Sequence, residues 1–184
     1  MPTTQLDALC RIKADHPPSS DWWFFPEEEE TKVQGFLGTG RIFIVGDQPS
    51  RDDWSFKHPH RRAFYQVLQE ENACDCHLTD FYKRRGYRSE LKNGFDGVIH
   101  CDSLKHIEIF HEEVELLRPS AILAMGRIAE RLLSTYTKYS HQYIVHFGVI
   151  SHAENERDRI AQRLKFETSL RTAIRQVRAS VLTC

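Results

Sequence analysis

The sequence contains no apolar run close to the roughly 18 residues that span a bilayer. Residues 1–15 also lack the apolar stretch of a secretory signal, so we expect a cytoplasmic protein without a membrane partner. The five cysteines are an odd number without regular spacing, which favours reduced thiols over disulfides. Internal repeats are absent too, and the only biased tract is the acidic run at 27–30.

The chain has 184 residues, of which 40% are hydrophobic and 28% are charged, as expected for one globular domain with a substantial core. Its net charge of −1 gives no general attraction to nucleic acid. Positive charge is nevertheless concentrated at residues 83–88 and again at 157–178. Such clusters either follow a phosphate backbone or form ordinary solvated faces, and the sequence leaves both open.

Hydrophobic periodicity predicts strands alternating with helices, which favours an α/β fold. We expect a three-layer α/β/α sandwich around a short, mainly parallel four-stranded sheet whose strand order stays open. Residues 1–40 are expected to form an N-terminal helix and an aromatic-rich extension packed on a main domain at 41–184. The predicted strands are 41–45, 76–81, 121–125 and 142–150, and the predicted helices are 3–14, 61–71, 103–118, 128–133 and 159–182.

Two of these helices carry apolar stripes that we expect to face the core. The helix at 103–118 has Asp102 or Ser103 as its candidate N-cap and ends before Pro119. Its stripe comprises Leu104, Ile107, Phe110, Val114 and Leu117. The stripe of the last helix comprises Ile160, Leu164, Leu170, Ile174, Val177 and Val181.

Asp47 follows the apolar strand 41–45 and stands in the short loop Gly46-Asp47-Gln48-Pro49. Open α/β folds build their sites at the carboxyl ends of the strands, where this loop would lie. Gly46 lets the backbone approach a ligand closely, and Pro49 stiffens the turn. Asp47 is therefore a candidate to orient a water or to stabilise a positive sugar, although a turn or capping aspartate has the same local pattern.

The second predicted strand ends in another acid, Asp80. Alternation places Leu78 and Asp80 on one face, which suggests a role beyond simple core packing, although a surface pair with a neighbouring arginine is the alternative. Late in the chain, His146 and His152 are candidates to donate a proton to a substrate oxygen. Each is also compatible with a solvated or packing histidine.

Four segments together resemble the uracil-DNA glycosylase superfamily, of which the chain would be a divergent member, and they occur in the same order. The resemblance covers roughly residues 41–182 and implies a glycosylase-like domain at 41–184. The four segments are the loop at 46–50, His-Leu-Thr-Asp-Phe-Tyr-Lys at 77–83, Leu-Leu-Arg-Pro-Ser-Ala-Ile-Leu-Ala-Met-Gly-Arg-Ile-Ala at 116–129, and Ser-His at 151–152.

The resemblance implies roles for particular residues. Asp47 would position water or balance the cationic sugar, and His152 would steady the oxygen of the departing base. Gly46 and Gln48 would face the base, which would stack on an aromatic ring of the following loop. Phe56 is our choice for that ring, and Trp54 is the second candidate.

Asp80 falls where members of the superfamily use Asn to recognise the pyrimidine edge. An ionised Asp accepts hydrogen bonds only, so its charge would oppose uracil O4 unless it were protonated or paired with Lys83. We therefore expect a specificity other than plain uracil, and an increase in uracil excision in Asp80→Asn.

We expect no cofactor, since the cysteines lack the spacing of an iron–sulfur site. The segment Cys74-x-Cys76-His77 lacks the two-residue gap and second pair typical of zinc. The expected partner is DNA, and whether it is single-stranded stays open. The expected product is the free base, and the protein is expected to be a monomer. Candidate phosphate contacts are Arg61, Arg62, Lys83, Arg84, Arg127 and Arg131.

The sequence thus predicts a hydrolase that cleaves the N-glycosidic bond of a flipped base in DNA. Two alternatives stay open. One is a non-catalytic module of the same fold that binds a nucleobase, nucleotide or DNA. The other is a small-molecule hydrolase that acts on free nucleosides.

Overall fold

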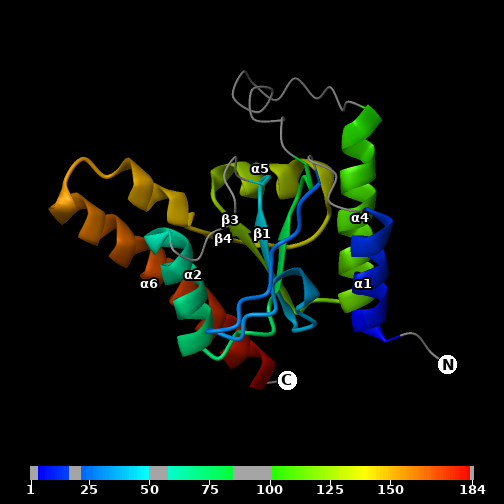
Figure 1. Cartoon of the computed structure of the whole chain (residues 1–184), viewed down its shortest axis with the longest axis horizontal. Helices are drawn as coiled ribbons and strands as arrows, with labels where there is room; N and C mark the ends of the chain where they lie inside the picture. Colours follow the sequence, from blue (N-terminus) through cyan, green and yellow to red (C-terminus); the bar gives the residue numbers. More distant parts are fainter. Residues whose placement is uncertain (1–3, 17–21, 50–57, 85–100, 183–184) are drawn as a thin grey trace.

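A computed structural model describes residues 4–16, 22–49, 58–84 and 101–182 (Figure 1). Its centre is a four-stranded sheet of order β2-β1-β3-β4 in which every pairing is parallel. The strands are β1 (Ile42–Gly46), β2 (His77–Asp80), β3 (Ala121–Met125) and β4 (Gln142–Ile144). This arrangement confirms the expected α/β sandwich with a short parallel sheet.

The helices lie on both sides of the sheet, with α2 and α6 on one side and α1 and α4 on the other (Figure 1). Strands β1 and β2 are buried along their whole length, because helices cover both faces of a parallel sheet. The helices are α1 (Gln5–Asp15), α2 (Pro59–Glu70), α4 (Cys101–Leu117), α5 (Arg127–Tyr136) and α6 (Glu156–Leu182), with short 3₁₀ helices η1 (Gly35–Leu37) and η2 (Phe147–His152).

The residues before β1 pack into the same hydrophobic core as the strands. Helix α1 begins at a capping box in which the Thr4 hydroxyl accepts from the Asp7 backbone N–H at 3.1 Å and the Asp7 carboxylate accepts from the Thr4 N–H. Leu9 and Phe36 are fully buried in that core. The N-terminal segment is therefore packed on the sheet domain rather than around a core of its own.

The fourth strand is shorter than predicted. The sequence predicts a strand at 142–150, but β4 ends at Ile144 and η2 follows. The physical reason is local, because the Gly148 N–H donates to Nδ1 of His146 at 2.8 Å instead of to a neighbouring strand.

Two helix predictions also need correction. Helix α4 begins at Cys101, so Asp102 and Ser103 lie inside it rather than at its N-cap. Leu104, Ile160 and Leu164 were expected to face the core but are 47%, 60% and 64% exposed. The first turns of α6 project past the edge of the sheet (Figure 1), so the buried side chains of α6 begin at Phe166. None of the helices in the described ranges is long and apolar enough to cross a membrane.

Candidate functional site

The carboxyl ends of β1 and β2 bring two acidic residues together. Gly46 is paired with Asp80 in the register, and Asp47 comes next along the chain. Beyond the strands, the Phe81 N–H donates to Gly46 O at 2.9 Å and the Tyr82 N–H donates to Asp47 O at 3.0 Å. Asp47 and Asp80 are 6% and 5% exposed, so both carboxyl groups sit in a largely dry environment.

Asp80 lies directly over the backbone of Gly46. A Cβ at position 46 would be 2.1 Å from Asp80 Oδ1 and 3.8 Å from Met125 Cε. The absence of a side chain at Gly46 is therefore what makes room for the Asp80 carboxyl group. The loop glycine that was expected to let a ligand approach also lets this acid lie across the end of β1.

Burial raises the pKa of Asp80 well above its ordinary value, and the neighbouring charges of Asp47 and Glu113 raise it further, against a lowering effect of Lys83. Desolvation and like charges both disfavour ionisation, which favours the neutral acid. A protonated carboxyl group has an O–H donor as well as an acceptor oxygen, as an amide side chain does. Of the states that the sequence left open for Asp80, burial therefore favours the protonated one over the ionised one.

Lys83 does not pair with the Asp80 carboxyl group. Its ammonium group lies 3.0 Å from Glu113 Oε1 and donates to the backbone oxygen of Asp80 at 2.6 Å. The side chain is 1% exposed, so it is directed into the core between β2 and α4. The expected phosphate contact of Lys83 is thus corrected, since a phosphate in solvent cannot reach it in this arrangement.

Glu113 is the centre of a buried polar network beneath β2. It accepts from the Thr79 hydroxyl at 2.9 Å and lies 3.4 Å from His77 Nε2. Burial alone would raise the pKa of Glu113, but Lys83 and His77 lower it below its ordinary value overall. The sequence interpretation missed Glu113, although its position three residues after the buried Phe110 and four before Leu117 places it on the inward stripe of α4.

His146 stands at the same edge of the sheet. Gly126 follows β3 with φ 97°, and a Cβ there would be 3.2 Å from the Cβ of His146. Nδ1 of His146 accepts from the Gly148 N–H, which leaves the proton of the neutral ring on Nε2. The ring also stacks on Phe147 with centroids 4.5 Å apart. The hydrogen bond from Gly148 therefore fixes the orientation of the His146 ring and makes Nε2 its donor nitrogen.

The remaining expected residues lie in different environments. His152 is exposed at the last position of η2, so the six-residue 3₁₀ helix separates it from His146. Gln48 is half-buried directly after Asp47. Phe56, together with Trp54, lies outside the described residues.

The arginines that were expected to contact phosphate differ in how far their side chains are exposed. Arg61 is buried, at 6% exposed, which corrects its expected role at the surface. Arg62 is exposed and Arg84 is half-buried. Arg127 is exposed, pairs with Glu130 at 2.8 Å and lies 4.0 Å above the Tyr143 ring. Arg131 is exposed on the same helix as Arg127.

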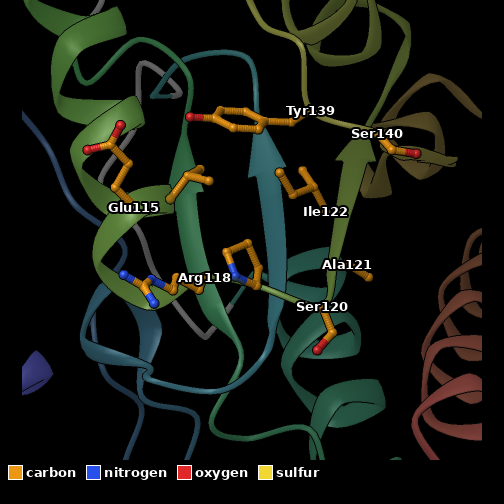
Figure 2. A pocket seen from close by; sticks show the side chains of 9 residues that line it. Glu115, Arg118, Ser120, Ala121, Ile122, Tyr139 and Ser140 are labelled. Carbon is orange, nitrogen blue, oxygen red and sulfur yellow. The ribbon is translucent and has the colours of Figure 1, made fainter. Parts of the chain in front are cut away.

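An open groove of about 630 Å³ lies at the opposite, amino edge of the sheet (Figure 2). Figure 2 shows Tyr139 and Ser140 at one end of it and Arg118 and Ser120 at the other. It contains none of the residues at the carboxyl edge. We place the candidate site at the carboxyl edge, because that edge holds the buried acid pair and is where parallel sheets bind ligands.

Among the residues that the structure describes, no group of three or more histidine, cysteine or acidic side chains is arranged to hold a metal ion. Cys74 donates to Thr31 O at 3.2 Å, and Cys76 is buried. No protein-family model matches the chain, and no curated protein matches it.

Proposed function

We propose that this chain is a DNA glycosylase-like hydrolase that cleaves the N-glycosidic bond of a base flipped out of DNA. The observation that carries the proposal is the pair of buried acids, Asp47 and Asp80, at adjacent strand ends. Burial and the charge of Asp47 raise the pKa of Asp80. A carboxyl pair of which one member stays neutral suits a reaction that needs both a carboxylate and a hydrogen-bond donor.

Asp47 is the residue for the sugar. As the glycosidic bond breaks, positive charge develops on the ring, and a carboxylate at this position stabilises that charge or orients the attacking water. The environment is dry, since Asp47 is 6% exposed, so this electrostatic attraction is weakened less than it would be in water.

Asp80 is the residue for the base edge. As a neutral acid it offers a donor and an acceptor side by side, which match the O4 acceptor and N3–H donor of uracil. By moving its proton to the other oxygen, the same group matches the N3 acceptor and exocyclic amine of cytosine. The charge conflict that the sequence suggested for uracil therefore disappears, and uracil joins the candidate bases.

His146 takes the role at the leaving base that the resemblance gave to His152. Its Nε2–H donor is set by the hydrogen bond from Gly148, and its position beside Gly126 places it at the same strand edge. A donated hydrogen bond to a carbonyl oxygen of the base stabilises the charge that the base acquires as it departs. His152, exposed on η2, has no such position.

The test is excision from single-stranded oligonucleotides that contain uracil, hypoxanthine or xanthine. We expect product from the wild type and loss of about 10²- to 10³-fold in the single-turnover rate of Asp47→Asn, the scale seen when one stabilising group is removed. The exposed Asp15→Asn is the matched control and should keep the wild-type rate. Tight binding without product would favour a non-catalytic module, and turnover of free nucleosides without DNA binding would favour a small-molecule hydrolase.

A further inference from the structure

A second groove, of about 430 Å³, lies where the start of α2, η2 and the start of α6 meet. Four basic side chains line it, His58 and His60 at the start of α2 and Arg159 and Arg163 on α6. They come from segments about a hundred residues apart, so the tertiary structure gathers them. None of the residues at the strand-end site lines this groove.

The side chains of the groove are held in place by contacts. Nδ1 of His60 lies 2.9 Å from the Ser151 hydroxyl, and the rings of His58 and His60 meet edge to face at 4.7 Å. Arg159 and Arg163 are four residues apart, so they lie on the same face of α6.

Each arginine also has an acidic partner on its own helix. Arg159 pairs with Glu156 at 2.6 Å, and Arg163 pairs with Glu167 at 2.7 Å. Each of these pairs uses one nitrogen, whereas a guanidinium group has five N–H donors. Both side chains can therefore donate to a further anion while they keep these pairs.

Basic side chains outnumber acidic ones in the lining of the groove. Glu156 is the one acid among its lining residues, against two arginines and two histidines. Burial lowers the pKa of His60, and the neighbouring positive charges of His58, Arg159 and Arg163 lower it further. A bound anion would relieve this repulsion between like charges.

We propose that this groove binds a phosphate group through Arg159 and Arg163, with His60 and Ser151 completing the contacts. Arginines bind phosphate oxygens well because their planar donors match the spacing of the oxygens. The phosphate comes from a DNA backbone, an assignment that rests on the proposed function, or from a free phosphate monoester.

The position of the groove relative to the strand-end site favours the DNA backbone. His146 is the N-cap of η2, and Ser151 is near the end of that 3₁₀ helix. At about 2 Å of rise per residue, the two lie on the order of 10 Å apart along η2. That separation suits the phosphate adjacent to the nucleotide whose base is bound at the strand ends, or the next phosphate along the DNA.

The test combines two readouts on the full chain, the first of which does not depend on DNA. Ring signals of His60 are titrated by NMR with and without inorganic phosphate. Because an anion favours the charged ring, phosphate should raise the pKa of His60. The matched variants are Arg159→Gln/Arg163→Gln, which should abolish this rise, and the exposed Arg157→Gln, which should leave it unchanged.

The second readout is the affinity for a single-stranded oligonucleotide as a function of salt. The double variant should bind more weakly, with a slope of log K against log salt reduced by about 0.7, the value for one phosphate. A His60 response to inorganic phosphate without any change in oligonucleotide binding would keep the site and assign it to a free phosphate. A His60 pKa that phosphate does not move, in a protein that binds oligonucleotide identically as wild type and double variant, would overturn the proposal. Base excision by such a protein would still stand.

Discussion

The carboxyl group of Asp80 occupies the space over Gly46 that a side chain at position 46 would need. Oδ1 lies 2.1 Å from the site of the missing Cβ, which is far inside normal contact distance. The two residues are partners in the β1–β2 register, so neither can move without disturbing the strand ends. The glycine at the end of β1 and the acid at the end of β2 are therefore coupled.

We expect Gly46→Ala to lower the free energy of unfolding by about 1–3 kcal/mol, because it overpacks a buried contact. Urea unfolding measures this change. In the background of Asp80→Ala, the same substitution should cost less, since the clashing oxygen is gone. A double-mutant cycle without coupling would show that the strain lies elsewhere.

Asp80→Asn should change how stability depends on pH. The folded-state pKa of Asp80 is raised by burial and by Asp47, above the value of about 3.9 in the unfolded chain. The wild type therefore has its full stability from this group below about pH 3.9 and loses it as the pH rises toward the folded pKa. The Asn variant should lack this loss, so the difference in unfolding free energy should shift in favour of the variant as the pH rises.

The same substitution tests recognition of the base. If neutral Asp80 donates and accepts as an amide does, uracil excision by wild type and Asp80→Asn should be similar at low pH. It should fall in the wild type alone as Asp80 ionises. A large gain for the variant at every pH would instead support the ionised carboxylate that the sequence suggested.

Breaking the buried pair between Lys83 and Glu113 should be costly. Glu113→Gln leaves the Lys83 charge uncompensated at a site that is 1% exposed, and we expect a loss of about 3–5 kcal/mol in unfolding free energy. Replacing both residues, as Lys83→Met with Glu113→Leu, should recover most of this loss. The exposed Glu112→Gln on the same helix is the control and should change stability little.

Glu71, after the end of α2, joins that helix to α6. It accepts from Arg175 at 2.6 and 2.9 Å and from Arg171 at 3.2 Å, and Arg178 donates to its backbone oxygen. The hydrogen bond from Arg175 lowers the pKa of Glu71, so its stabilisation is present above the unfolded value of about 4.3 and is lost as the pH falls. Glu71→Gln should cost about 1–2 kcal/mol at neutral pH in thermal or urea unfolding. An equal cost at pH 3 would contradict this explanation.

The arginines of α6 fall into two groups with different surroundings. Their concentration suggested either a phosphate-binding patch or a solvated face. In the structure, Arg171, Arg175 and Arg178 converge on the end of α2, whereas Arg159 and Arg163 line a groove. The division depends on where along α6 each residue meets the neighbouring helix, which local sequence does not specify.

Periodicity in the sequence determined the secondary structure and the fold class. Strand β3 was predicted at its observed bounds, and β1 and β2 within two residues, because buried strands are short apolar runs ended by Gly or polar residues. The order of strands and helices then dictated a parallel sheet. It also placed Asp47 and Asp80 at one edge, since parallel strands share their carboxyl ends.

Only the tertiary structure decided the chemical state of that edge. In the tertiary structure Lys83 pairs with Glu113, and Asp80 is buried beside Asp47. His146 rather than His152 lies at the strand ends. Protonation and pairing depend on burial and on charges from segments distant in the chain, here α4 packed under β2. These long-range effects leave no periodic signal in the sequence. For that reason the placement of Asp47 and Asp80 at one edge could be predicted, while the raised pKa of Asp80 could not.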